Sequence, residues 1–348
     1  MPRDGAHEVR EYLGTATRAP SSDDSVTSNP RIAWRASLGR GTVGAAAIGE
    51  RVSAVATVDR FVYAFDTRTG QPFWRYRGEG PFGAGPAMSG GRIVAASEGH
   101  DGTLAAIDVF TGKRLWRRSI GDVAAPLAIA DGAVYGATQA DGLAFAVAVA
   151  DGRVLWRRRT GPSRAGPLVV GRYVTIATLT DTLVILDRFS GATVTFAALG
   201  ASSIAPLARA NDSTAVLASP AGIVMAITVP SGRVQWRVGT GEAVAGAPAI
   251  ARDTVFALTN GCELWMIPLA APDEAAAAPL DCVASTGPLV VRGGVLVATI
   301  GGEVVLFDRR SRTRLWSRHL GSEIRHPPIV LNGQVVVAPS LGNVVSLR

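Results

Sequence analysis

Residues that could carry acid–base or metal chemistry are few and far apart in this sequence. Its four histidines are His7, His100, His319 and His326. None of them is spaced from another as paired metal ligands are. Residues 98–102 gather Glu98, His100 and Asp101, which together could bind a cation. Polar residues in a turn between strands are usually solvated, so we expect no metal site there and no catalytic residue.

A second set of residues recurs at fixed offsets along the chain. The stretch LAAIDVFTGKRLWRRSIG, residues 104–121, places an aspartate, a threonine, a glycine and a tryptophan in a strand, a turn and a second strand. The stretch VYAFDTRTGQPFW, residues 62–74, has the same arrangement. The motif residues of this and the other copies are Trp34, Trp74, Trp116, Trp156, Trp236, Trp316, Asp66, Asp108, Asp187, Asp308, Gly70 and Gly112.

The spacing of these residues gives a period of about 40. From Trp34 to Trp236 the steps are 40, 42, 40, 39 and 41 residues, with Thr195 in one tryptophan position. The 80 residues from there to Trp316 span two units, so we expect a degenerate copy near Ala277. Prolines repeat with the same period: Pro86, Pro126, Pro167, Pro206, Pro248, Pro288 and Pro328.

Each unit contains four short β-prone runs separated by turns, and no segment has a sustained helical period of apolar residues. Four strands per unit of this length are typical of a β-propeller blade. The sequence therefore predicts an all-β, eight-bladed propeller over residues 31–348. Its last residues, NVVSLR, correspond to a third strand, and RIAW at Trp34 to a fourth. We expect the two ends to complete one blade together.

Because the motif is present in most blades, we interpret it as structural. The tryptophans are expected to lie flat between adjacent sheets. Asp108 and Thr111 are expected to hold the hairpin turn by short hydrogen bonds, and Gly112 to supply a positive φ.

The stretch AIDVFTGKRLW resembles the tryptophan-docking motif of the pyrroloquinoline-quinone-like propeller repeats, and the resemblance covers residues 31–348. That family includes quinoprotein dehydrogenases and non-catalytic propellers that resemble the scaffold of the outer-membrane β-barrel assembly machine. The dehydrogenases carry adjacent cysteines, long insertions and, where haem is bound, a Cys-x-x-Cys-His motif. This chain has none of these features, so the resemblance favours the scaffold branch and no cofactor.

Cys262 and Cys282 lie in the degenerate unit, before its third strand and at the end of its fourth. Transferring the pairing of the turn at residues 109–112 places Cys262 opposite roughly Asp281, one position from Cys282. Opposed residues of neighbouring strands are close enough for a disulfide. We expect a disulfide, with two separate buried thiols as the alternative. A disulfide would indicate an oxidising compartment.

The candidate partner-binding residues are arginines: Arg157, Arg158, Arg159 and Arg164. They are expected at the end of the outer strand of the third complete blade and in the loop to the next blade. Charge on an outer strand can simply keep that strand soluble. Arginine is also enriched at interfaces, where it makes planar bidentate contacts. In the resembled scaffold, loops in this part of the ring contact the membrane-embedded partner.

Charge and composition bear on partners and location. The formal net charge is +7 and aromatic residues make up 6% of the chain, so no stacking platform for nucleic acid is expected. No apolar run is long enough to span a membrane. Residues 1–30 are polar and expected to be disordered. They show no signal-peptide core and no lipid-attachment cysteine, so a trimmed form, a misplaced start and a cytoplasmic protein all stay open.

These observations favour a non-catalytic scaffold that presents inter-blade loops to a protein partner. The expected setting is a periplasmic or other extracytoplasmic assembly associated with a membrane. The alternatives are an accessory subunit of another membrane complex and a quinone-binding or other small-molecule-binding protein.

Overall fold

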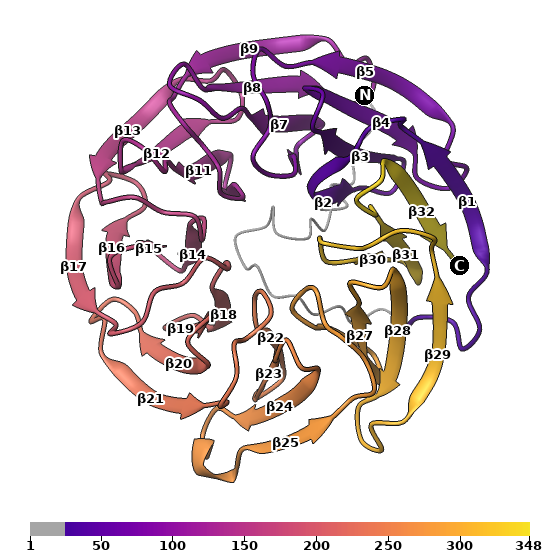
Figure 1. The fold of residues 1–348 in the computed structure, drawn as a ribbon. Helices are drawn as coiled ribbons and strands as arrows, with labels where there is room; N and C mark the ends of the chain where they lie inside the picture. Colours follow the sequence, from indigo (N-terminus) through magenta and orange to yellow (C-terminus); the bar gives the residue numbers. More distant parts are fainter. Residues whose placement is uncertain (1–24) are drawn as a thin grey trace, which may run out of the picture.

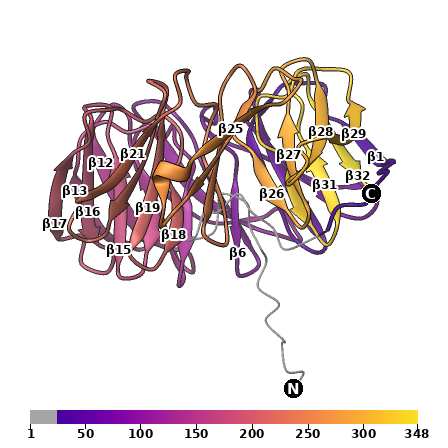
Figure 2. The same cartoon turned by 90° about the horizontal axis from the view of Figure 1, so that it is seen from below.

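The computed structural model describes residues 25–348, which form eight four-stranded antiparallel sheets arranged as blades of a ring (Figure 1). The predicted all-β, eight-bladed propeller is therefore confirmed. Seen from the side, the blades stand next to one another in a single layer (Figure 2). In this part of the chain, no helix is long and apolar enough to cross a membrane.

In blades 1 to 7 the four strands follow one another in sequence from the centre of the ring to its edge. Blade 1 comprises β2 (Thr42–Ile48), β3 (Val52–Thr57), β4 (Phe61–Asp66) and β5 (Pro72–Arg77). Blade 2 comprises β6 (Ala87–Ser89), β7 (Arg92–Ala96), β8 (Thr103–Asp108) and β9 (Arg114–Ser119). Blade 3 comprises β10 (Ala128–Ala130), β11 (Ala133–Ala137), β12 (Leu143–Ala148) and β13 (Val154–Arg159). Blade 4 comprises β14 (Leu168–Val170), β15 (Tyr173–Ala177), β16 (Thr182–Asp187) and β17 (Thr193–Ala198).

The second half of the ring has the same plan. Blade 5 comprises β18 (Ala208–Asn211), β19 (Thr214–Ser219), β20 (Ile223–Thr228) and β21 (Val234–Gly239). Blade 6 comprises β22 (Ala249–Ala251), β23 (Thr254–Leu258), β24 (Glu263–Pro268), the short 3-10 helix η1 (Pro272–Glu274) and β25 (Ala276–Pro279). Blade 7 comprises β26 (Leu289–Val291), β27 (Gly294–Ala298), β28 (Glu303–Asp308) and β29 (Arg314–His319). Blade 8 comprises β30 (Ile329–Leu331), β31 (Gln334–Val337), β32 (Asn343–Leu347) and β1 (Ile32–Ser37).

Blade 8 closes the ring with strands from both ends of the sequence. Its order is β30, β31, β32 and β1, and Arg35 of β1 pairs with Val345 of β32. Arg31 and Arg348 exchange backbone hydrogen bonds of 2.7 and 2.9 Å. The first and last colours of the chain meet in this blade (Figure 1). The expected closure is therefore confirmed, and it removes a free sheet edge between the ends.

Five of the six motif tryptophans, all except Trp316, donate an indole hydrogen bond to the next blade. The Trp116 Nε1 donates a hydrogen bond of 2.8 Å to the Val149 carbonyl in the hairpin of blade 3. Gly152 in the same hairpin has φ 72°, and a Cβ there would lie 2.6 Å from the Trp116 ring. The glycine is thus required both by its backbone conformation and by the approach of the indole. Equivalent indole bonds join Trp34 to Thr67, Trp74 to Val109, Trp156 to Arg188 and Trp236 to Leu269.

The motif aspartates hold the hairpins between the third and fourth strands. Asp108 Oδ1 accepts hydrogen bonds from the Thr111 N–H and hydroxyl, both 2.8 Å, and from the Phe110 N–H at 3.2 Å. Bonds that need the charged carboxylate lower its pKa. At Asp187, the Ser190 N–H and then the Arg172 guanidinium lower the pKa to about 2. Asp66 and Asp308 make the same turn.

Two blades depart from the motif. In blade 4, Thr195 takes the tryptophan position, and the facing Gly232 lies against Thr195 and Ala197. In blade 6, Met266 of β24 pairs with Ala276 of β25, whereas blade 1 pairs an alanine with its tryptophan. In blade 6 the large residue of this pair therefore lies on the third strand and the small one on the fourth, the reverse of blade 1. Met266 packs against the buried cluster between blades 6 and 7.

Cys262 and Cys282 are joined by a disulfide, with their Cα atoms 5.6 Å apart. The expected register was wrong by one residue, because the Leu280 N–H donates to the Cys262 carbonyl at 2.9 Å, which places Cys262 opposite Leu280 rather than Asp281. β25 also ends at Pro279, so Cys282 lies in the loop beyond it. The chain turns at Asp281, where the Cys282 N–H donates to the Leu280 carbonyl at 2.7 Å, and Cys282 packs against the buried cluster that contains Cys262.

Residues 25–30 lead into β1 along blades 7 and 8. Val26 packs against the buried cluster that contains Trp316, and Arg318 donates a hydrogen bond of 2.7 Å to the Pro30 carbonyl. Residues 1–24, which make up most of the segment expected to be disordered, lie outside the described residues.

Candidate functional site

The structure separates the four arginines of the predicted partner site. Arg157, Arg158 and Arg159 end β13, the outermost strand of blade 3 (Figure 1). Arg164 instead lines the central cavity and donates a hydrogen bond of 2.9 Å to the Gln139 side chain. The loop after β13 returns the chain from the rim to the centre, which a linear reading of the sequence did not show. Arg164 and the β13 arginines therefore do not form one surface.

Two of the rim arginines connect neighbouring blades. Arg157 donates a hydrogen bond of 2.8 Å back to the Ser119 carbonyl at the end of β9 in blade 2. Arg158 donates a bond of 2.7 Å forward to the Gly191 carbonyl in the hairpin of blade 4. These two hydrogen bonds thus connect blades 2, 3 and 4 at the outer edge of the ring. Charge-assisted hydrogen bonds of this kind are among the stronger ones in proteins.

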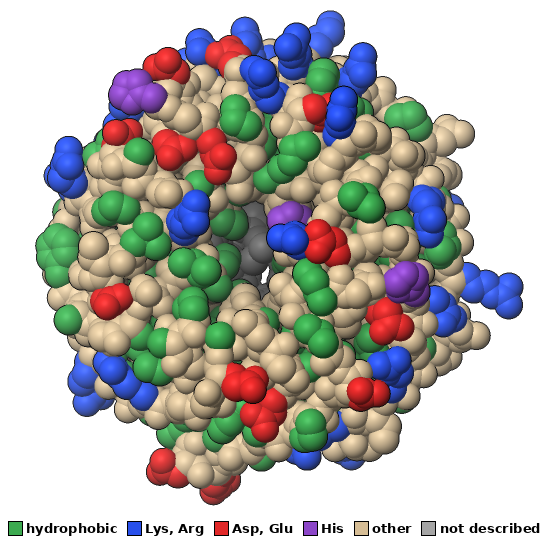
Figure 3. All heavy atoms as spheres, in the orientation of Figure 1, with side chains coloured by type: hydrophobic (Ala, Val, Ile, Leu, Met, Phe, Trp, Pro, Cys, Tyr) green, Lys and Arg blue, Asp and Glu red, His purple; other side chains and the backbone are tan. Residues whose placement is uncertain are grey.

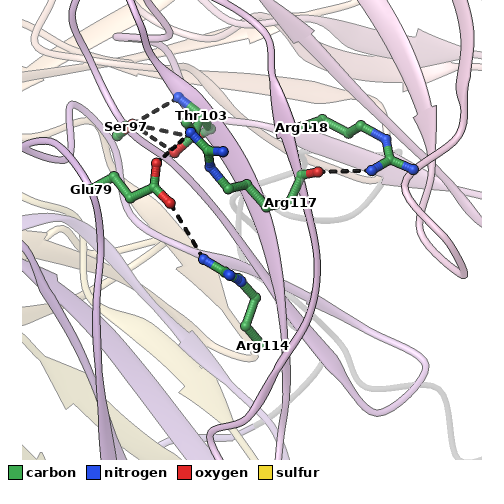
Figure 4. Close-up of polar contacts among 6 residues, drawn as sticks. All are labelled: Glu79, Ser97, Thr103, Arg114, Arg117 and Arg118. Carbon is green, nitrogen blue, oxygen red and sulfur yellow. Dashed lines mark hydrogen bonds and ion pairs between the residues drawn. The ribbon is translucent and has the colours of Figure 1, made fainter.

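The same connections recur in other blades, at the first and second positions after the docking tryptophan. Arg237 donates back to the Leu199 carbonyl at 2.7 Å, as Arg157 does to Ser119. Figure 4 shows the version in blade 2, where Glu79 lies between Arg114 and Arg117 at 3.3 and 2.5 Å. Arg118 reaches forward to the Asp151 carbonyl. The repeated Trp-Arg-Arg sequence is the signal that could have revealed this structural role.

Arg159 is the member of the predicted set that remains open to a partner. It is exposed and lies opposite Leu143 in the β12–β13 pairing. Within residues 25–348, no hydrogen bond or ion pair engages its guanidinium. Figure 3 shows that lysine and arginine side chains on this face of the ring lie mostly toward the periphery.

A cavity of about 490 Å³ occupies the centre of the ring. Its wall is built mainly from glycine, alanine and proline at the inner ends of the blades, and Figure 3 shows the hollow at the centre of this face. Polar side chains in the wall include Arg164, Asn260, Thr286, Arg325 and His326. Among the described residues that line the cavity, none is an aspartate or a glutamate.

This donor set does not fit a quinone cofactor with its divalent metal ion, which needs carboxylate and amide oxygens converging on one place. Asn260 supplies one amide, and Arg325 is already paired with Glu323 at 2.9 and 3.1 Å. In residues 25–348, no three His, Cys, Asp or Glu side chains are grouped to hold a metal ion.

His326 is the most buried ionisable side chain in the cavity wall. Its Nε2 accepts a hydrogen bond of 3.0 Å from the Gly44 N–H, which joins the loop into blade 8 to β2 of blade 1. Burial lowers the pKa of His326. A hydrogen bond with the Thr42 backbone raises this pKa, and the neighbouring Arg325 charge lowers it. The neutral imidazole thus helps to close the ring.

The turn that carries Glu98, His100 and Asp101 is connected to the next blade through its backbone. The Gly99 N–H within it donates a hydrogen bond of 2.8 Å to Asp122 Oδ1 in the loop that leads to blade 3. Burial raises the pKa of Glu98, and the nearby Asp122 carboxylate adds to that shift. The bond between the Gly99 N–H and Asp122 therefore connects blades 2 and 3.

Comparison of the fold with solved structures finds propellers of both functional branches. The crystal structure of BamB from Moraxella catarrhalis has a TM-score of 0.76 at 16% identity and covers 92% of this chain and 100% of that chain. A europium-containing methanol dehydrogenase has a TM-score of 0.78 at 12% identity, with 97% and 98% covered. Quinohemoprotein alcohol dehydrogenase from Comamonas testosteroni has a TM-score of 0.77 at 13% identity, with 99% and 81% covered. At these identities the likeness establishes the fold alone.

Sequence comparison identifies the family. No curated protein sequence matches the chain. The profile of the family described as outer membrane protein assembly factor BamB matches residues 26–164 and 140–347, which together span the whole ring. The chain therefore belongs to the outer membrane protein assembly factor BamB family.

Proposed function

We propose that this protein is a non-catalytic scaffold in an extracytoplasmic, membrane-associated assembly, with a role like that of the outer-membrane β-barrel assembly propeller. The observation that carries this proposal is the family match over residues 26–347. A rigid ring in which neighbouring blades are joined by indoles, arginines and hairpins is well suited to hold a binding surface in a fixed shape. Binding energy at such a surface is concentrated in a few residues.

The cavity supports binding of a protein partner over catalysis. Its wall of glycine, alanine and proline offers backbone and small apolar groups, and the carboxylates needed to bind a quinone and metal ion are missing from the described lining. The dehydrogenase-like alternative would have to bring such groups from elsewhere.

The disulfide supports an extracytoplasmic location. Cys262 is fully buried and linked to Cys282 within blade 6. Disulfides persist mainly in oxidising compartments such as the periplasm. The same setting is the one expected for the outer-membrane assembly machinery.

The proposed contact surface is the outer rim at blades 3 and 4, with Arg159 as the arginine that meets the partner. Arg157 and Arg158 border the same surface, but their guanidinium groups also hold blades 2, 3 and 4 together. Arg164, in the cavity wall, belongs to a different surface. The charge on this rim favours an acidic partner surface.

Affinity capture with crosslinking from solubilised membranes of the native organism tests this proposal. We expect near-stoichiometric recovery of one membrane-embedded complex and its loss in Arg159→Glu. Arg77→Glu is the matched control, because Arg77 is exposed and ends β5 of blade 1 as Arg159 ends β13. Single substitutions are preferred to replacing Arg157, Arg158 and Arg159 together, which would also break contacts between blades.

The identity of the captured complex decides between versions of the proposal. A β-barrel insertion machine would establish the outer-membrane assembly role, and an energy-converting or transport complex would establish an accessory role elsewhere. Capture of no partner, together with saturable binding of pyrroloquinoline quinone and Ca²⁺ in calorimetry, would contradict the scaffold proposal.

A further inference from the structure

The outermost strand of blade 4 differs from the outermost strands of the other blades. β17 has the sequence Thr-Val-Thr-Phe-Ala-Ala, with no charged residue and no proline. Among the described outermost strands, β1, β5, β9, β13, β21 and β29 each carry at least one arginine, and β25 ends in proline. Charges and prolines are the usual means of keeping an edge strand from pairing with another chain. β17 has neither.

The backbone of β17 is open on its outer side. β17 pairs with β16 and stands at the end of the sheet order of blade 4. An edge strand leaves alternate N–H and C=O groups without a neighbouring strand. Threonine, valine and phenylalanine favour the extended conformation that such pairing needs. The strand therefore offers both the hydrogen-bonding groups and the conformation for a fifth strand.

The side chains of β17 divide between the ring and the solvent. Thr195 and Ala197 face the blade 5 hairpin at Gly232. Val194 and Phe196 are 45% and 63% exposed. A strand laid along β17 could cover these two apolar side chains with its own.

Arginines border both ends of the strand. Arg158 of blade 3 binds the Gly191 carbonyl in the hairpin that precedes β17. Arg237 of blade 5 binds the Leu199 carbonyl directly after β17. The edge is thus apolar in the middle and cationic at each end.

This charge pattern selects the occupant. If a second copy of this chain paired through β17, cationic ends would meet cationic ends in either strand direction, which disfavours self-association. An extended segment with alternating apolar residues between acidic ends would place a carboxylate near each arginine. The pattern is therefore complementary to such a segment and unfavourable for a homodimer.

We propose that β17 is a strand-addition site, where a partner protein docks an extended segment with an apolar centre and acidic ends as a fifth strand of blade 4. Backbone hydrogen bonds would supply much of the affinity in this mode, and side-chain contacts the specificity. This inference deepens the proposed function and rests on it for the existence of a partner. It is carried by β17 itself, independently of Arg159.

A labelled synthetic peptide tests the site on the whole protein. The probe is fluorescein-labelled DETVTVTVED, with KRTVTVTVRK as the charge-reversed peptide, and binding is measured by fluorescence anisotropy. We expect saturable binding of the acidic peptide and at least tenfold weaker binding of the basic one. Hydrogen–deuterium exchange should show new amide protection confined to residues 193–198.

Matched variants locate the binding. Val194→Arg and Phe196→Arg should each weaken binding of the acidic peptide at least tenfold. Leu315→Arg should leave binding within twofold, because Leu315 is 50% exposed at the same position of β29 as Val194 in β17. All three positions are exposed, so circular dichroism should show an unchanged fold.

Several outcomes would overturn the inference. These are equal weakening by Val194→Arg and Leu315→Arg, protection outside residues 193–198, and a dimer in sedimentation that Val194→Arg dissolves. Partner capture that depends on Arg159, combined with no peptide binding, would remove the strand-addition site and leave the proposed function standing. Peptide binding at β17 without any captured complex would leave the strand-addition site standing and remove the proposed scaffold function.

Discussion

The contact between Trp116 and Gly152 gives the sharpest test of how the ring is held together. Gly152 has φ 72°, and an added Cβ would lie 2.6 Å from the indole of Trp116. Gly132, in another turn of the same blade, has φ 74° and no atom within 4 Å of an added Cβ. Comparing alanine at these two glycines therefore separates the backbone cost from the loss of indole docking.

The expected magnitudes follow from this geometry. Alanine in a left-handed conformation costs about 1 to 2 kcal/mol, and Gly132→Ala should show this cost alone. Gly152→Ala must also displace the indole from its site and from its hydrogen bond to Val149. Removing a buried tryptophan side chain costs about 3 to 5 kcal/mol. We therefore expect Gly152→Ala to lower the free energy of unfolding by about 3 to 5 kcal/mol in total.

Urea unfolding followed by far-UV circular dichroism measures these values, provided that the variants share one m-value. In a Trp116→Ala background the collision is absent, so Gly152→Ala should cost only the backbone amount of about 1 to 2 kcal/mol. The interaction energy of this double-mutant cycle is then about 2 kcal/mol. Equal effects of Gly152→Ala and Gly132→Ala, or no coupling to Trp116→Ala, would refute the docking argument.

Three further predictions concern the disulfide, the hairpin aspartates and the rim arginines. Cys282→Ala should lower the free energy of unfolding by about 3 kcal/mol in urea, because the disulfide closes a loop between residues 20 apart. A reductant should lower the free energy of unfolding of the wild type by the same amount. The folded-state pKa of Asp187 is about 2, below its ordinary value of 3.8, so its stabilisation is complete above about pH 4 and is lost as pH falls toward 2. Thermal unfolding of Asp187→Asn should therefore depend less on pH in that window than the wild type, and parallel profiles would contradict this. Arg158→Ala should cost about 1 kcal/mol through its lost bond to blade 4, whereas Arg159→Ala should change stability by less than about 0.5 kcal/mol, as differential scanning calorimetry can show.

The sequence was sufficient for the fold because every blade repeats the same local signals. The period of the tryptophans and prolines gave the number of blades, and the alignment of NVVSLR and RIAW gave the closure of blade 8, with β1 beside β32. The missing motif of blade 6 also had a readable cause, since Met266 and Ala276 exchange the large and small positions of a cross-strand pair. To recognise such an exchange, one must know which residues of the two strands pair. At Cys262 the pairing expected from the sequence was wrong by one residue.

The candidate site was less predictable because charge along the chain does not show where each side chain points. Arg157, Arg158, Arg159 and Arg164 lie within one short stretch, yet two of them bind neighbouring blades, one is open and one lines the cavity. β17 was missed for the opposite reason. Its distinguishing feature is the lack of the charges found on other outer strands, which becomes visible only when the outermost strands are compared with one another.

Site-specific photo-crosslinking in intact cells tests the central claim of partner binding at this rim most directly. A photoreactive residue would replace Phe196 of β17 and, as the control, Leu315 of β29, both of which are exposed on outermost strands. The account predicts that position 196 crosslinks to one component of a membrane-associated assembly and that position 315 does not. Equal crosslinking from both positions, or none from position 196 in membranes that retain the protein, would contradict it.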